Sequence, residues 1–290
     1  MDFVKFTQLI DLKKNPMILK VYQPESPVLK RYIECFYILE KTAAEKPITY
    51  FTFPSIYSIV TISAETSTFV SPDKIITTYC PTSPIETNLV CDFNQPVLIS
   101  YDGKINEITT YFKPLGLSAF IVHDLQHYNS GTFPDFNPHA DYKEAMTAIL
   151  AIADHQERIR ALEAYWISKL RPFEDPLLEN VLREMLDTNN LNQSMTTLSR
   201  KIGRSRTTIN KHFDQHICKS PSQFKKIVRF RAAIQSQLDD KNNISRSYHV
   251  DYFDQSHMIR DFKKLTGFTP KVFFSKIAAL ERDEIKWIFI

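Results

Sequence analysis

Two short stretches near the C-terminus carry polar and basic side chains at matching positions, 49 residues apart. Each copy begins with a residue type that caps helices. Apolar residues follow four and eight positions later, and a Ser/Thr-Pro step precedes a final aromatic residue. This spacing predicts an amphipathic helix followed by a turn in each copy. The repeated positions are Ser205, Ile209, Lys211, Phe213, Ser220, Pro221 and Phe224, and then Asp254, Met258, Arg260, Phe262, Thr269, Pro270 and Phe273.

The side chains between the apolar positions are of the types that recognise base edges. Asn pairs with adenine, Lys and Arg pair with guanine, and Thr or Ile can contact the methyl group of thymine. Polar residues on an amphipathic helix usually only face solvent, but two matched copies favour helices that read DNA in the major groove. The predicted base contacts are Arg206, Thr207, Asn210 and Lys211 in the first copy, and Gln255, Ser256, Ile259 and Arg260 in the second.

Basic residues are concentrated in the same part of the chain. Residues 196–276 hold 17 Lys and Arg against 6 Asp and Glu, whereas the rest of the chain holds 19 against 27. The overall net charge of +3 hides this asymmetry. A basic segment can release counterions from DNA phosphates, and a set of its lysines is spread around both copies. The predicted phosphate contacts are Lys225, Lys226, Lys263, Lys264 and Lys271.

The second copy resembles the signature of the AraC/XylS family of bacterial transcription regulators. The resemblance rests on the run from Asp251 to Pro270, which contains an Asp-Gln-Ser-His step and a Gly-x-Thr-Pro step. The first copy, residues 198–224, resembles the first helix-turn-helix of that family. The resemblance implies two three-helix subdomains joined by a linker helix over residues 221–239. It also implies recognition helices in successive major-groove segments of promoter DNA, about one helical turn apart.

Three departures from the family pattern leave the base contacts of the second copy open. Arg246 and Ser247 stand where the family usually has an Ile-Ala pair, and Asp251 stands where it has glycine. Cys218 replaces the turn glycine of the first copy, whereas Gly267 is retained in the second. A charged residue at a normally buried position is costly unless its head reaches solvent. The second copy could therefore bind DNA mainly through phosphates.

The N-terminal two-thirds of the chain predict a second kind of structure. Residues 49–113 are rich in Thr, Ile, Val, Tyr and Phe, with breaks at 71–72, 81–84, 94–96 and 102–103. This pattern indicates short strands that close into a sandwich or barrel. Helices are predicted over residues 114–125, over 142–170 as one or two helices, and over 176–187.

Residues 27–37 and 111–120 resemble segments of the cupin-like sensor domains found on some of these regulators. The expected fold class is therefore an α+β multidomain chain, with a cupin-like β-barrel domain and an all-α domain of two helix-turn-helix subdomains. The expected divisions are a sensor or dimerisation domain over 1–172, a connecting helix over 173–190, the DNA-binding domain over 191–280 and a tail over 281–290. Besides double-stranded DNA, the candidate partners are RNA polymerase, an unidentified small-molecule effector and a second copy of the chain. Apolar residues within 142–170 are the candidate dimer surface.

No catalytic residue, metal ligand or cofactor site is predicted, and we expect the chain not to be an enzyme. The first 122 residues contain no histidine, so a metal cupin lacks its ligands. His123 and His127 could bind a metal only with a third ligand. The chain has no nucleophile elbow and no phosphate loop, and its 5 glycines leave little material for one.

Two alternatives stay open. The first is an architectural DNA-binding protein without a ligand. The second is a thiol-sensing, metal-sensing or enzymatic domain fused to a DNA-binding domain, with Cys80 and Cys91 on neighbouring predicted strands as the candidate thiol switch. No apolar stretch approaches the length that spans a bilayer, and residues 1–5 lack a signal-peptide pattern. We therefore expect a cytoplasmic, nucleoid-associated protein without a membrane partner.

Overall fold

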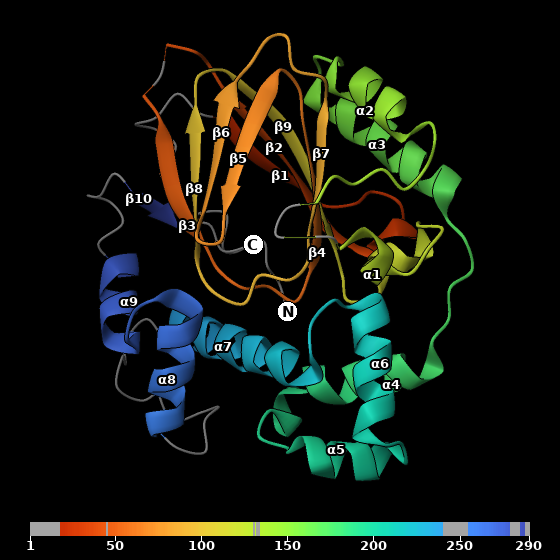
Figure 1. Cartoon of the computed structure of the whole chain (residues 1–290), viewed down its shortest axis with the longest axis vertical. Coiled ribbons are helices and arrows are strands. Elements are labelled where there is room, and N and C mark those ends of the chain that lie inside the picture. Colours follow the sequence, from red (N-terminus) through yellow and green to blue (C-terminus); the bar gives the residue numbers. More distant parts are fainter. Residues whose placement is uncertain are drawn as a thin grey trace.

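Alternating apolar and polar residues between positions 18 and 112 form two sheets that pack face to face (Figure 1). The computed structural model describes residues 18–44, 46–129, 131, 134–239, 255–278 and 285–287. The first sheet has the strand order β1 (Ile18–Tyr22), β2 (Ile33–Lys41), β9 (Ile105–Phe112), β4 (Ser58–Ser63) and β7 (Glu86–Val90). The second has the order β10 (Ile285–Trp287), β3 (Ile48–Thr52), β8 (Val97–Asp102), β6 (Lys74–Tyr79) and β5 (Thr66–Ser71).

Most neighbouring strands are antiparallel, and β6 with β8 and β3 with β10 are the parallel pairs among the described strands. The predicted breaks separate β5 from β6, β6 from β7, β7 from β8 and β8 from β9. We call the two sheets together the barrel. The predicted β-rich domain is therefore confirmed.

Strand β2 is buried on both faces, which explains its almost continuous apolar sequence. Cys35, Tyr37 and Leu39 point between the two sheets. Phe36 and Ile38 point the other way, into a core shared with the helices that follow the barrel. Because successive side chains of a strand face opposite sides, one strand joins both cores.

Helices α2 (Tyr142–Leu150) and α3 (His155–Lys169) cover the outer face of the first sheet (Figure 1). The sequence predicted one or two helices here, and the structure has two. Their large apolar side chains pack inward: Ile159, Leu162 and Trp166 are almost fully buried. The prediction of a dimer surface on this segment is therefore wrong, because its large apolar side chains complete the core of their own domain.

The predicted helix over residues 114–125 is also wrong. The chain forms only two short turns there, η5 (Gly116–Ala119) and α1 (Leu125–Tyr128). Leu115 has a φ of 67°, and a Cβ on Gly116 would lie 2.1 Å from the carbonyl oxygen of Tyr32. This close approach holds the backbone against η4 (Leu29–Arg31) and its C-cap, so a regular helix cannot continue.

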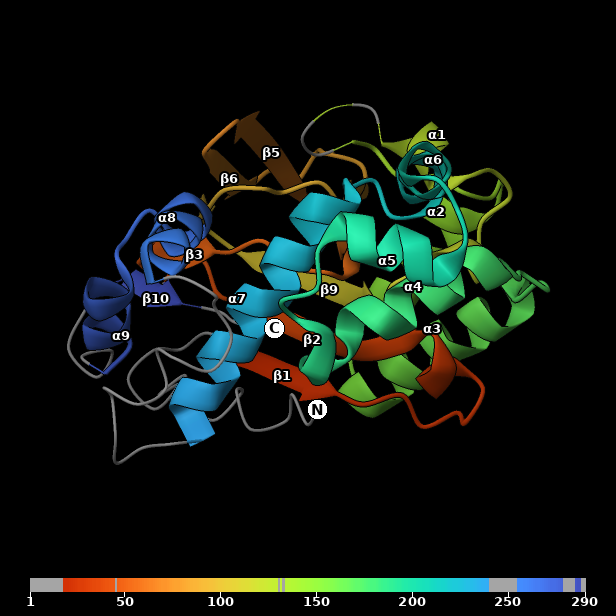
Figure 2. The same ribbon diagram turned by 90° about the horizontal axis from the view of Figure 1, so that it is seen from below.

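The C-terminal part of the described chain is helical (Figures 1 and 2). Helix α4 (Pro176–Leu186) lies within the helix predicted over residues 176–187. Helix α7 (Pro221–Asp239) has the bounds predicted for the linker helix. No described helix is long and apolar enough to cross a membrane. The elements are α4 (Pro176–Leu186), η6 (Thr188–Asn190), α5 (Met195–Ile202), α6 (Arg206–His216), α7 (Pro221–Asp239), α8 (Gln255–Thr266) and α9 (Pro270–Ala278).

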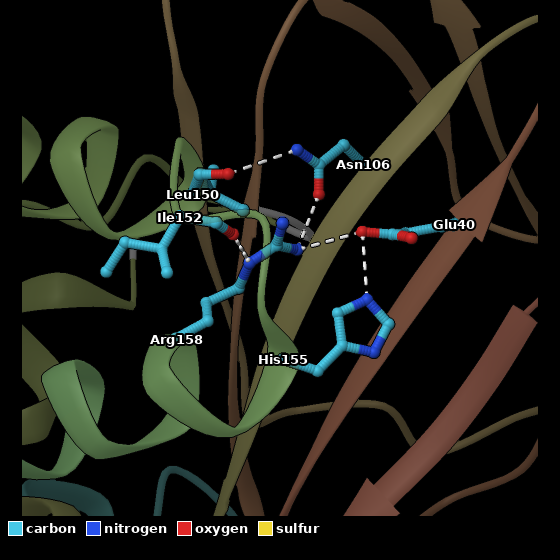
Figure 3. Close-up of polar contacts among 6 residues, drawn as sticks. All are labelled: Glu40, Asn106, Leu150, Ile152, His155 and Arg158. Carbon is cyan, nitrogen blue, oxygen red and sulfur yellow. Dashed lines mark hydrogen bonds and ion pairs between the residues drawn. The ribbon is translucent and has the colours of Figure 1, made fainter.

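A buried arginine fastens the α2–α3 pair to the first sheet (Figure 3). Arg158 donates through Nε to the carbonyl oxygen of Ile152 at 2.8 Å, and through Nη1 to Glu40 at 3.1 Å and Asn106 at 3.0 Å. Asn106 in turn donates to the carbonyl oxygen of Leu150 at 3.3 Å. The guanidinium therefore ties the turn between α2 and α3 to strands β2 and β9.

We expect Arg158→Met to lower the free energy of unfolding by about 2 to 4 kcal/mol, because it leaves several acceptors without a donor in a buried place. Denaturant unfolding of the full chain measures this. Arg160→Met is the matched control: Arg160 is exposed and lies 3.7 Å from Glu25. Its substitution should change stability by less than about 0.5 kcal/mol. Equal effects of the two substitutions would contradict this role for Arg158.

Candidate nucleic-acid interface

Helix α6 presents one apolar and one polar face, as the first copy of the repeat predicts. Ser205 caps it by accepting a hydrogen bond from the amide of Thr208 at 3.0 Å. Ile209 and Phe213 are fully buried. The four predicted base contacts on this helix are all exposed: Arg206, Thr207, Asn210 and Lys211. The geometry therefore leaves these side chains available to a groove.

The turn before α6 gives the pair of helices its angle. Helix α5 begins at its cap Ser194 and ends at Gly203, which has a φ of 70°. Glycine adopts this left-handed backbone without strain. Leu198 of α5 packs in the same core as Ile209 and Phe213 of α6. Residues of α4 complete this core, so α4, α5 and α6 form a three-helix unit, which we call the first unit.

Helices α8 and α9 belong to the second unit. Phe262 of α8 and Phe273 of α9 are buried against each other, with ring centroids 5.8 Å apart. Ile259 and Arg260, two of the predicted base contacts, are exposed. Gln255 and Ser256 lie in the first turn of α8, but their side chains fall outside the described residues, as do Arg246, Ser247 and Asp251.

Helix α7 supplies side chains to the cores of both units. Phe224 and Val228 pack in the core of the first unit. Ile227 and Phe230 pack in the core of the second. The two members of each pair are three or four residues apart, so each pair shares one face of the helix, and the two pairs lie on different faces. The two units lie at opposite ends of α7 in Figure 1 and on either side of it in Figure 2.

The predicted phosphate contacts fall into two groups. Lys263, Lys264 and Lys271 are exposed, whereas Lys226 is half-buried, with its Nζ 3.7 Å from Asp261. Lys225 is buried, with only 5% of its surface exposed, so the structure contradicts its assignment as a phosphate contact in this arrangement. Burial lowers the pKa of Lys225 to about 8, and the charge of Arg229 acts in the same direction. The side chain lies on a face of α7 that packing covers.

The barrel contacts both units. Phe53, in the segment between β3 and β4, packs on Phe273 with ring centroids 5.4 Å apart. Arg231 of α7 donates to the carbonyl oxygen of Pro54 at 3.3 Å. On the other side, Gln215 of α6 donates to Asp124 at 3.2 Å. Residues of the N-terminal domain therefore contact α6, α7 and α9.

A cavity of about 70 Å³ lies at this domain interface. Glu107 in its wall accepts hydrogen bonds from Tyr101 at 2.8 Å, from Tyr37 at 2.9 Å and from Thr109 at 3.2 Å. Burial raises the pKa of Glu107, and the three hydrogen bonds oppose that shift. Because both carboxyl oxygens are already engaged, the arrangement is that of a structural anchor.

Lys219 completes the cavity from the side of the first unit. It lies in the turn between α6 and α7, yet only 4% of its surface is exposed, and it lines the same cavity as Tyr101 and Glu107. Burial lowers the pKa of Lys219, and the nearby Cys91 and Asp92 oppose that shift. Sequence reasoning missed Lys219, because a lysine in a turn between two helices is normally exposed.

His123 and His127 were the candidate metal ligands, and Cys80 and Cys91 were the candidate thiol switch. The rings of His123 and His127 lie 4.4 Å apart. Among the described residues, no group of three His, Cys, Asp or Glu side chains could hold a metal ion. Cys80 and Cys91, the candidate thiol switch, follow β6 and β7, which belong to different sheets and are not neighbouring strands.

Comparison with known proteins assigns the C-terminal segment to a family. Residues 198–276 match the family model of a helix-turn-helix domain. Among solved structures, ToxT from Vibrio cholerae in its P21 form is 11% identical, with a TM-score of 0.44, covering 90% of this chain and 98% of that one. Unsaturated fatty acid bound wild-type ToxT from Vibrio cholerae strain SCE256 is 12% identical, with a TM-score of 0.41, covering 90% and 96%. No curated protein matches the chain.

The matched segment begins at Leu198, where the first copy of the repeat begins, and extends past the second copy. Residues 198–276 are an AraC-type helix-turn-helix domain, which follows a β-rich N-terminal domain. This domain supports the role of a DNA-binding transcription regulator. The fold class expected from the sequence is confirmed.

We expect Lys225→Met to raise the free energy of unfolding at pH 7 by about 1 to 3 kcal/mol, because it removes a buried charge. The folded-state pKa lies below the unfolded value, so raising the pH from about 8 to about 10 stabilises the wild type and the advantage of the variant should shrink. Denaturant unfolding at both pH values measures this. Lys271→Met, at an exposed position, is the control. A destabilised Lys225→Met variant would contradict the burial argument.

Proposed function

We propose that the chain is a sequence-specific regulator that binds promoter DNA with α6 and α8 in successive major-groove segments. The observation that carries this proposal is the division of α7 between two cores. One rigid helix holds both units, while exposed side chains on α6 and on α8 point away from those cores. A helix reads a groove in this way, with one stripe on its own domain and the other on base edges.

The proposed base contacts are assigned by side-chain chemistry. Asn210 suits adenine, and Lys211 and Arg260 suit guanine. Thr207 and Ile259 suit the methyl group of thymine. Arg206, Gln255 and Ser256 complete the proposed set. Exposed lysines supply the phosphate contacts that hold the register without reading sequence: Lys263, Lys264 and Lys271, with Lys226 at the edge of the set.

The chain divides into four segments with separate proposed roles. We propose a sensor domain over residues 1–172, a connecting helix over 173–190, the DNA-binding domain over 191–280 and a tail over 281–290. The connecting segment contains α4, whose apolar face belongs to the core of the first unit. Movement of the sensor domain would therefore act on the first unit directly.

The cavity is the proposed place for a small-molecule effector. A ligand shifts an equilibrium only by binding one arrangement better than the other. Lys219 of the first unit and Glu107 of the barrel both line the cavity, so a molecule there would contact both domains. One water needs roughly 10 to 15 Å³ of such a cavity. The cavity of about 70 Å³ therefore fits a compact polar molecule of a few non-hydrogen atoms.

Screening such molecules for shifts in the melting temperature of the full chain tests this site. The Lys219→Met substitution should remove most of the shift that a bound effector causes, whereas the control Lys143→Met, on α2, should leave the shift intact. Shifts that are the same in both variants would place the effector elsewhere.

We expect Lys211→Ala to weaken binding to the preferred duplex by about 1 to 3 kcal/mol and to relax the preference at one base position. Binding to an unrelated duplex should fall much less. Lys143→Ala, a change on α2 outside both helical units, should leave both affinities unchanged. Fluorescence anisotropy with the two duplexes measures the difference. Unchanged affinity for the preferred duplex would exclude α6 as the reading helix.

Lys263→Ala should act differently, because a phosphate contact carries no sequence information. We expect it to weaken binding to both duplexes by the same factor and to reduce the slope of log affinity against log salt by about 1. Titrations at several salt concentrations measure this slope. If Lys263→Ala instead altered the preferred sequence, it would belong to the base contacts. Equal affinity of the wild type for unrelated duplexes would favour the architectural alternative.

A further inference from the structure

Two free cysteines from different domains meet at the domain interface. Cys91 follows β7 of the barrel, and Cys218 lies in the turn between α6 and α7. Both are buried, with 3% and 8% of their surfaces exposed, and both belong to the core that the barrel shares with α2 and α3. The two thiols lie close enough to perturb each other, and Cys91 shares a cavity lining with Lys219, the residue next to Cys218. Residues distant in sequence therefore place two sulfur atoms side by side across the interface.

The backbone at Cys218 is strained for a residue with a side chain. Its φ is 56°, in the left-handed region that glycine favours, and its amide closes α6 by donating to the carbonyl oxygen of Phe213 at 3.0 Å. Such a conformation costs roughly 1 kcal/mol or more for residues other than glycine. A side chain is thus held, against that cost, at the position where it reaches Cys91.

The surroundings make the two thiols unequal. The neighbouring Cys218 thiol lowers the pKa of Cys91, and the ammonium group of Lys219 lowers it further, against the effect of burial. The proximity of Cys91 and burial raise the pKa of Cys218, whose own thiol donates to the carbonyl oxygen of Asp214 at 3.9 Å. Cys91 also donates to Asn129 Oδ1 at 3.2 Å, which fixes its orientation. Cys91 is therefore the thiol that ionises more readily, and Cys218 is placed to react second.

Cys91 borders a space that a small oxidant can occupy. The residue lines the cavity of about 70 Å³, which is large enough for several water-sized molecules. Hydrogen peroxide, with two oxygen atoms, is within that size. By contrast, Cys35 is not part of the cavity lining, and burial raises its pKa. The cavity therefore exposes one member of the pair to a peroxide while the rest of the core stays closed.

We propose that Cys91 and Cys218 form a reversible disulfide between the barrel and the first unit when the protein meets hydrogen peroxide. The Cys91 thiolate attacks one peroxide oxygen: an S–O bond forms, the O–O bond breaks, and the leaving hydroxide takes up the proton that Cys91 released, giving water and a sulfenic acid. The Cys218 thiolate then attacks that sulfur, so the S–S bond forms and the S–O bond breaks. The second hydroxide takes up the Cys218 proton. Two thiols and one peroxide give one disulfide and two waters, and a dithiol reverses the reaction.

The disulfide holds the α6–α7 turn against the loop after β7. The contacts of Phe53 and Arg231 attach α7 to the barrel at other places, and none of them is covalent. Oxidation therefore converts one attachment of the first unit from a packing contact into a bond. This site does not depend on which bases α6 reads, so its failure would leave the proposed function intact.

The test is disulfide mapping of the full-length wild type. The protein is treated with hydrogen peroxide, its remaining thiols are alkylated under denaturing conditions, and non-reduced peptides are identified by mass spectrometry. We expect two of the four thiols to be lost. The linked peptides should contain Cys91 and Cys218, and the link should disappear with dithiothreitol. Because this measurement needs no variant, poor folding of a variant cannot obscure it.

Variants then test the order of reaction. Cys218→Ser should stop at a sulfenic acid on Cys91, which dimedone traps, whereas Cys91→Ser should leave Cys218 reduced. Cys35→Ser and Cys80→Ser are the controls, and both should keep the Cys91–Cys218 link. A link between Cys80 and Cys91, a link between two copies of the chain, or four intact thiols after peroxide would each overturn the proposal.

Discussion

The burial of α7 between two helical units and the barrel is the constraint on which the rest of the structure depends. Phe224 and Phe230 lie two turns apart at most, yet they belong to different cores. Each core holds the helix that carries the exposed polar residues of one repeat copy. The direction in which α6 and α8 present these residues is therefore set by the packing of a third helix, which need not contact DNA itself.

The barrel acts on this arrangement through the same helix. Phe53 enters the core of the second unit, and Lys219 of the first unit lines a cavity whose other walls are barrel residues. A change inside the barrel can thus reach both units without passing along the chain. The buried cation Lys219 makes this interface costly to form, because burial removes its solvation and the nearby Cys91 and Asp92 offset that loss only in part. An interface of this kind can be shifted by a modest binding energy.

Local chemistry was enough to predict the elements that have strong start and stop signals. Helix α4 was predicted from the apolar spacing within residues 176–187, whereas the bounds of α7 came from the resemblance to the AraC/XylS family. The breaks between β5 and β9 were predicted because proline, glycine and asparagine interrupt a β-forming sequence. The exposure of Thr207 and Asn210 followed from the apolar spacing of Ile209 and Phe213.

The features that sequence reasoning did not predict depend on contacts between residues that are distant in the sequence. The helix expected over 114–125 fails because Gly116 touches the carbonyl of Tyr32, which no local pattern records. Lys225 and Lys219 are buried because other segments cover them, although lysines on helices and turns are usually exposed. Cys91 was paired with Cys80 by proximity in sequence, whereas the fold brings it to Cys218.

Selection of DNA from a random duplex pool with the full-length protein tests the central claim most directly. Two exposed reading helices on one rigid linker predict an enriched site with two short motifs, separated by about one helical turn of 10 base pairs. Arg260→Ala should erase the motif that α8 reads and keep the other. A single motif with the wild type would show that only one unit reads bases. No enrichment at all would contradict sequence-specific binding and leave only electrostatic attraction to phosphates.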